Sequence, residues 1–166
     1  MFFKRTSFNN RVVQGEWHAL WQTSVEHSEN INFEVIDLQW KGEYLYIANR
    51  SKSEQNPDGG YLWKAQCSVY DSQYVIGTYV AIEDSVMARG TIYLVIHRSG
   101  RHMLGHWMGC NFDSEWAHGL MAMAQERERL AELLERHVQE FPSMPYWSGP
   151  DRSEARSDNH ERTTNE

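Results

Sequence analysis

The sequence lacks the features of several large protein classes. No apolar run among its 166 residues approaches the roughly 20 residues of a membrane-spanning helix, so we expect no membrane span. The net charge of −7 argues against binding to long nucleic acids, which usually requires a basic face. The first ten residues, MFFKRTSFNN, contain no apolar core of a secretory signal. These absences favour a cytoplasmic domain.

Cysteine is scarce, and the motifs of common enzymes and metal sites are missing. Cys67 and Cys110 are too few for a disulfide framework, and we expect buried thiols in a reducing cytosol. No Gly-x-Ser-x-Gly, glycine-rich phosphate loop, Cys-x-x-Cys or His-Glu-x-x-His motif occurs. His102 and His106 are four residues apart, but on a strand that spacing is roughly 13 Å, too far for one metal ion. We therefore predict no enzymatic activity, no cofactor and no metal site.

What the sequence does contain is a series of short runs with a period of two. In GEWHALWQT, Trp17, Ala19 and Trp21 fall on one face of a strand. Turn signals at Lys41-Gly42, at Asp71-Ser72 and at residues 98–101 separate such runs. The further runs are INFEVIDLQ, GEYLYIANR, GYLWKAQCSVY, QYVIGTYVAI, GTIYLVIHR, RHMLGHWMGC and EWAHGLMA. This spacing without intervening helices predicts a mainly β fold, an antiparallel eight-stranded up-and-down barrel over residues 13–122, after an N-terminal arm of residues 1–12.

A glycine, one residue and then a large aromatic form a unit that recurs along the predicted strands. It occurs as Gly15-Glu16-Trp17, Gly42-Glu43-Tyr44, Gly77-Thr78-Tyr79 and Gly105-His106-Trp107. Small barrels must bend their strands sharply to close, and glycine permits such bends. The units therefore mark strand starts or corners, and their aromatics either fill the core or line a cavity.

The pattern changes to helical spacing near the C-terminus. Residues 123–141 carry an apolar stripe on a charged background, which predicts an amphipathic helix that ends before Pro142. The stripe consists of Met123, Leu130, Leu133, Leu134, Val138 and Phe141. It could pack on the open end of the barrel, on the outer wall or on a second copy, and the charged flanks favour a homodimer through residues 123–141. Residues 142–166 are polar without periodicity and predict a disordered tail.

Two groups of known β-barrels resemble this pattern. GEWHALW, FEVIDLQWKGEYLYI and YVIGTYV resemble the calycin pattern of streptavidin and lipocalins, which form eight-stranded up-and-down barrels. IGTYVAIEDSVMARGTIYLVI, followed by GRHMLGHWMG, is similar to the soluble barrel of the two-transmembrane, β-strand-rich effectors of CBASS-type antiphage systems. The resemblance covers roughly residues 12 to 120. In the effectors the barrel binds a cyclic nucleotide. Because this chain departs from them in lacking membrane segments, the resemblance implies a sensing or sequestering role.

Two long connections, residues 49–60 and 83–90, carry Arg50, Lys52 and Arg89, which could be solvated loop charges or form an anion-binding rim above the barrel. Arginine suits phosphate and carboxylate groups, and aromatic side chains stack on flat ligands. We therefore expect a barrel that binds a small, flat, anionic ligand, with a nucleotide or cyclic nucleotide as the best candidate. The predicted contacts are stacking on Trp17, Tyr79 and Trp107, ion pairs with Arg50 and Arg89, and hydrogen bonds to Asn49 or His106.

A rival hypothesis is a protein-interaction module. In that case the barrel fills its interior with its own side chains, and the stripe from Leu130 to Phe141 is the working surface. An enzyme is a third alternative. A structure that shows whether the barrel interior is open or filled separates the first two hypotheses.

Overall fold

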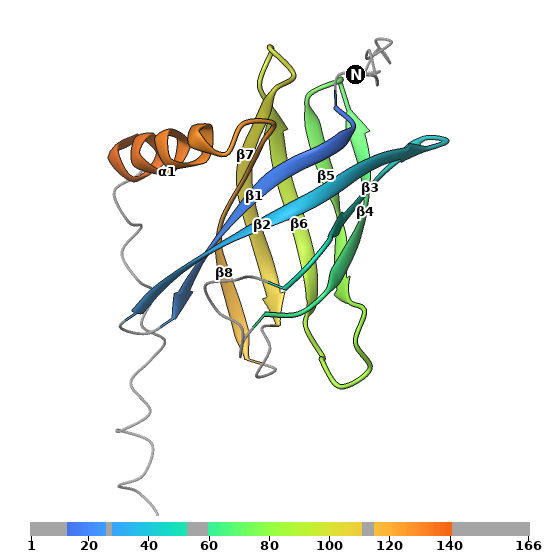
Figure 1. Cartoon of the computed structure of the whole chain (residues 1–166), viewed down its shortest axis with the longest axis vertical. Helices are drawn as coiled ribbons and strands as arrows, with labels where there is room; N and C mark the ends of the chain where they lie inside the picture. The colour runs from blue at the N-terminus through green and yellow to red at the C-terminus, as the bar shows by residue number, and fades with distance from the viewer. Residues whose placement is uncertain (1–12, 26–27, 53–59, 111–114, 141–166) are drawn as a thin grey trace, which may run out of the picture.

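The computed structural model describes residues 13–25, 28–52, 60–110 and 115–140 and shows a closed barrel of eight antiparallel strands in up-and-down order (Figure 1). The predicted fold class is thereby confirmed. The strands are β1 (Gly15–Val25), β2 (Ser28–Lys41), β3 (Tyr44–Asn49), β4 (Trp63–Tyr70), β5 (Tyr74–Ala81), β6 (Arg89–Ile96), β7 (His102–Cys110) and β8 (Trp116–Ala124), and α1 (Glu128–Glu140) follows them.

The sheet closes where β1 pairs with β8, with Trp21 opposite Met121 and Ser24 opposite His118. At this seam the Nε1 of Trp107 donates a hydrogen bond to the carbonyl of Gln22 at 3.0 Å. A Cβ on Gly119 would collide with the same carbonyl oxygen, so only glycine lets the two strands approach this closely. The backbone of Gly119 and the indole of Trp107 therefore both lie close to one carbonyl of β1 at the seam.

The recurring glycines occupy two kinds of position. Gly15 and Gly42 have positive φ, at the start of β1 and in the turn between β2 and β3. Gly77 and Gly105 lie within strands, and a Cβ on Gly105 would collide with the carbonyl oxygen of Tyr93 on β6. Both predicted roles, strand start and close approach, therefore occur.

Three of the four aromatics in these units point into the barrel. Trp17, Tyr79 and Trp107 are buried in the main core, whereas Tyr44 is 42% exposed. The core also takes Ile36 and Leu38 from β2. The apolar residues of INFEVIDLQ that precede them, among them Ile31, lie on the opposite, outer face of β2.

Helix α1 packs against the outer wall of its own barrel. Leu130 and Leu133 are buried in a second apolar cluster with Leu20 of β1 and with Ala122 and Ala124 of β8. Of the three surfaces that the sequence left open, the structure selects the outer wall. The prediction that favoured a homodimer through residues 123–141 relied on this stripe, most of whose described residues pack within the chain instead.

The boundaries of the helix also differ from the sequence prediction. Strand β8 continues to Ala124, so Met123 belongs to the barrel core and α1 begins at Glu128. The helical spacing had included Met123 in the stripe, but Met123 pairs with Met103 of β7 and therefore belongs to β8. Phe141, the predicted tail of residues 142–166 and the arm of residues 1–12 lie outside the described residues. Within the described part of the chain, no helix has the length and apolar character needed to cross a membrane.

Strand β2 is longer than the strand beside it. It pairs with β1 from Ser28 to Leu38, but with β3 only from Ile36 to Lys41. Figure 1 shows β1 and β2 running together past the end of β3. The carbonyl of Val35 still accepts a hydrogen bond from the backbone N–H of Arg50 at 3.0 Å. N-terminal to Val35, β2 has no partner strand on this side.

The packing of α1 yields a stability prediction. Leu130→Ala removes a fully buried side chain from the cluster between helix and barrel and should lower the free energy of unfolding by about 2–5 kcal/mol. Because the contact lies within one chain, thermal unfolding should shift equally at low and high protein concentration. Glu132→Ala, on the exposed side of α1, is the control and should have little effect. A loss of stability that disappears at high concentration would contradict this packing.

Candidate functional site

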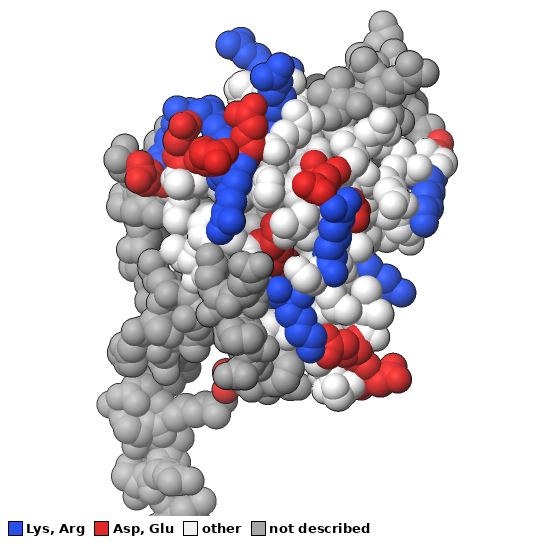
Figure 2. Space-filling view, viewed as in Figure 1, with Lys and Arg blue, Asp and Glu red and all other residues white. Residues whose placement is uncertain are grey.

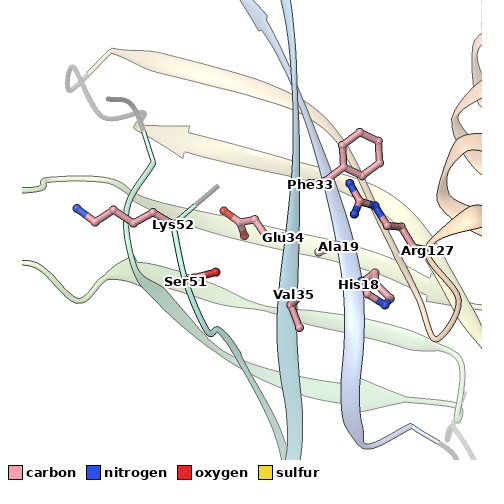
Figure 3. Close-up of a pocket in the computed structure, with 8 residues that line it drawn as sticks. All are labelled: His18, Ala19, Phe33, Glu34, Val35, Ser51, Lys52 and Arg127. Atoms are coloured by element: carbon pink, nitrogen blue, oxygen red, sulfur yellow. The ribbon is translucent and has the colours of Figure 1, made fainter. Parts of the chain in front are cut away.

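A hollow of about 90 Å³ lies where β2 loses its pairing with β3. The edge of β2 around residues 33–35 forms one wall, and the segment after β3 forms another (Figure 3). The residues that line it are His18, Ala19, Phe33, Glu34, Val35, Ser51, Lys52 and Arg127. They come from β1, β2, the segment after β3 and the segment before α1, so the hollow is built by tertiary structure and not by one local motif.

Glu34 is the acidic member of this lining. Its Oε2 accepts a hydrogen bond from the Nε1 of Trp63 at 2.8 Å. Burial raises the pKa of Glu34 to about 7, although hydrogen bonds from Trp63, Trp21 and Asn49 oppose the rise. At neutral pH the carboxyl group is therefore close to half protonated, whereas an ordinary glutamate is fully ionised at that pH.

Behind Glu34 the barrel interior is filled by aromatic rings. Trp21 meets Trp63 edge to face with ring centroids 4.9 Å apart, and it meets Tyr79 and Trp107 at 5.7 Å. The hydroxyl of Tyr79 is buried without a hydrogen-bond partner among the described residues. The Nε1 of Trp21 is also buried without a hydrogen bond of good geometry. Its N–H nevertheless interacts with the Glu34 carboxyl group and lowers the pKa of that group. These rings therefore fill the interior behind Glu34, and the hollow lies beside them.

Asn49, one of the predicted ligand contacts, holds the second wall of the hollow in place. Its Nδ2 donates to the carbonyls of Ser51 at 3.1 Å and Tyr61 at 2.9 Å. Its Oδ1 accepts from the backbone N–H of Trp63 at 2.8 Å. One buried amide thus ties the end of β3 to the start of β4, and its polar groups are used for structure.

Basic side chains surround the hollow. Arg127 lies over the ring of Phe33, 5.6 Å from its centroid, and Lys52 pairs with Glu83 at 2.9 Å. Figure 3 shows Arg127 and His18 on one side of β2, and Ser51 and Lys52 on the other side together with the Glu34 carboxyl group. Over the visible face of the molecule, basic and acidic side chains are interspersed (Figure 2). The positive charge at the hollow is therefore local.

The aromatic residues predicted to stack on a ligand are core residues. Trp17 and Tyr79 are 0% and 1% exposed, and Trp107 is 5% exposed. The N–H groups of Trp17 and Trp107 donate to the backbone carbonyls of Gln14 and Gln22. The structure thus brings Tyr79 and Trp107 together in one cluster, but their rings face other side chains.

The remaining predicted contacts lie on the outer surface and do not line the hollow. Arg50 forms ion pairs with Asp37 at 2.7 Å and with Glu16, and the guanidinium lowers the pKa of the Asp37 carboxyl group. Arg89 is exposed at the start of β6, and His106 is exposed on β7. Neither Arg50 nor Arg89 is therefore part of the hollow.

The residues that sequence reasoning missed are Glu34, His18 and Arg127, whereas Lys52 was among the basic residues predicted for a rim. Glu34 carried a signal, because it stands at an alternate position with Ile36 and Leu38 on the inward face of β2. A charged residue in phase with a core pattern is a common sign of a functional position. His18 and Arg127 carried no such signal, since their proximity depends on closure of the barrel.

Comparison with known proteins supports the fold and gives no family. No family model matches this chain, and no curated protein matches it. Among solved structures, the chain is similar to a redesigned β-barrel, mFAP1, determined with DFHBI bound. The two share 11% sequence identity with a TM-score of 0.52, over 72% of this chain and 100% of the other. The eight-stranded barrel of the calycin resemblance therefore stands, while the resemblance to CBASS-type effectors has no family evidence behind it.

The raised pKa of Glu34 predicts a specific pH dependence of stability. Because the folded state holds this proton more tightly than the unfolded chain, stability from this group is complete below about pH 4.5. It is lost as the pH rises toward 7. Glu34→Gln cannot ionise, so it should gain about 1–3 kcal/mol on the wild type between pH 4 and pH 8. Denaturant unfolding at a series of pH values measures this, with the exposed Asp84→Asn as the control. Parallel curves for wild type and Glu34→Gln would contradict the prediction.

Proposed function

We propose that this protein binds a small anionic ligand at the hollow beside β2 and carries out no catalysis on it. The barrel supports this proposal, because the similar barrel mFAP1 was determined with a small molecule, DFHBI, bound to it. The site proposed here keeps Lys52 of the predicted rim, and Arg127 and His18 take the place of Arg50 and Arg89.

The observation that carries the proposal is that three basic residues line one hollow, His18 and Arg127 on one side of β2 and Lys52 on the other. His18 comes from β1, Lys52 follows β3 and Arg127 precedes α1. A volume of about 90 Å³ corresponds to roughly three water molecules, enough for one phosphate- or carboxylate-sized group. The planar guanidinium of Arg127 can offer two parallel N–H groups to such a group. The remainder of the ligand would lie outside the hollow.

A nucleotide or cyclic nucleotide is the ligand that we propose in more detail. It brings phosphoryl oxygens for the hollow and a flat base for the apolar surface beside it, where the ring of Phe33 lies under Arg127. A sensing or sequestering role in bacterial antiphage signalling is the furthest step of the proposal and rests on the sequence resemblance alone. A cytoplasmic location is likewise proposed, and the free thiols of Cys67 and Cys110 agree with a reducing compartment.

A second candidate function is a protein-interaction module. The surface that favours it is on the barrel wall and not on the helix. The outer faces of β5, β6 and β7 expose Ile76, Val80, Tyr93 and Met108, each by more than 40% of its area. Adjacent exposed apolar side chains on a sheet are typical of association sites. If two copies pair here, Tyr93→Glu with Met108→Glu should turn a dimer into a folded monomer in light scattering. A wild type that is already monomeric would remove this version.

The proposed anion site predicts which arginine matters. Arg127→Gln should weaken the binding of a nucleotide about tenfold to hundredfold, the usual effect of losing a charged hydrogen bond. Arg89→Gln is the matched control and should leave affinity unchanged, because Arg89 does not line the hollow. Isothermal titration calorimetry with nucleoside monophosphates, cyclic dinucleotides and cyclic trinucleotides measures both variants.

Two results would count against this site. If none of these compounds binds the wild type at millimolar concentration, the nucleotide proposal fails. If a nucleotide binds and Arg89→Gln weakens it while Arg127→Gln does not, the ligand lies on another surface.

A further inference from the structure

The outer faces of β4 to β7, continued by the start of β8, form a surface without a carboxylate. None of the outward residues on these described strands is Asp or Glu, although the chain has 23 acidic residues and a net charge of −7. The permanently charged residues on this surface are Lys64 on β4 and Arg89 on β6, and both are exposed. We call it the acid-free wall. The acidic residues nearest in the sequence, such as Asp71 and Glu83, lie in connections between the strands.

The cations of the acid-free wall lie next to exposed apolar side chains. Strand pairing places five outward residues in one row across the wall: Lys64, Val80, Arg89, Cys110 and Trp116. Trp116, at the end of this row, is 79% exposed, and Met108, two residues before Cys110 on the same face of β7, is 56% exposed. Positive charge and apolar surface are therefore combined in one patch.

A second row on the same wall is aromatic. Ile76 on β5 lies opposite Tyr93 on β6, and Tyr93 lies opposite His106 on β7. The ring of Tyr93 stacks on that of Tyr74, with centroids 6.4 Å apart, and Tyr93 is still 44% exposed. Tyrosine and tryptophan with an apolar ring and a polar tip are the residues that proteins place at the boundary between lipid headgroups and acyl chains.

Charge distinguishes between the partners that could cover such a surface. Two copies paired through it would bring Lys64 and Arg89 of both chains into an interface without a carboxylate, and cations that lose water without gaining a partner are unfavourable. A single-stranded nucleic acid supplies negative charge, but it offers little to the aliphatic side chains of Ile76 and Val80. A membrane with anionic lipids offers phosphate and carboxylate groups to the cations and acyl chains to the apolar side chains.

We infer that the acid-free wall docks the barrel on the surface of a membrane that contains anionic lipids. Lys64 and Arg89 lie at the level of the lipid phosphates, and Met108 and Trp116 enter the boundary between headgroups and acyl chains. The cytoplasmic leaflet carries such lipids, which agrees with the proposed location. No residue of this wall lines the hollow, so a docked barrel can still take up a ligand there.

Flotation of the full chain with vesicles tests the inference. One set of vesicles is phosphatidylcholine alone, and the other contains roughly one third phosphatidylserine. We expect the wild type to float with the mixed vesicles at about 0.1 M salt and to partition at least about tenfold less into phosphatidylcholine. Raising the salt to about 0.5 M should release most of the protein, because the attraction between the basic residues and the lipids is screened.

Paired variants locate the surface that binds. Arg89→Gln should lower the partition coefficient about fivefold, the usual effect of one basic residue near an anionic membrane. Met108→Glu should lower it at least about tenfold, because a carboxylate is repelled and an apolar contact is lost. Ile31→Glu on the outer face of β2 and Arg136→Gln on α1 are the matched controls, since both residues are exposed and lie outside the wall. Both controls should float as the wild type does.

The outcomes separate the membrane from the other partners. If the wild type floats with neither set of vesicles, or if only the control variants lose binding, the inference is wrong. A dimer in light scattering that Tyr93→Glu with Met108→Glu dissociates would assign the wall to a second copy. Binding of poly(U) that Arg89→Gln weakens, without flotation, would assign it to nucleic acid. Nucleotide binding at the hollow is measured without vesicles, so none of these results decides the proposed anion site.

Discussion

The carboxyl group of Glu34 lies in the wall of a small barrel among aromatic rings, and burial there opposes its ionisation. The constraint arises from one feature of the topology. Strand β2 outruns β3, so the wall around Val35 is completed by a segment that Asn49 ties to β4 and not by another strand pair. The same gap admits the hollow, and the same aromatic cluster that fills the interior behind it supplies the indole N–H that holds Glu34.

Much of the fold could be predicted because it depends on short-range order. Alternation with a period of two requires no knowledge of distant residues, and the eight runs became eight strands. Gly15 and Gly42 likewise indicate local backbone conformations with positive φ, which other residues rarely adopt. The boundary between the last strand and the helix was harder to predict from the sequence. Ala122, Met123 and Ala124 fit the end of a strand as well as the start of a helical stripe, and the register with β7 decides between them.

The site could not be predicted to the same degree, because its residues meet only after the barrel closes. Arg50 and Arg89 were chosen as loop cations, but Arg50 is paired with Asp37 and Glu16 from other strands. Alternation placed Tyr79 and Trp107 inside the barrel, yet it does not show whether the interior leaves room beside them. Lys52 and Arg127 are far apart in the sequence. They line one hollow because both lie beside β2 in the closed barrel.

The measurement that tests this account most directly is the titration of the Glu34 carboxyl carbon by NMR in the free, folded protein. The buried position in the barrel wall predicts a midpoint near pH 7. A midpoint near 4.5, the ordinary value for glutamate, would show that water reaches the carboxyl group freely. In that case the closed wall beside β2 would not hold.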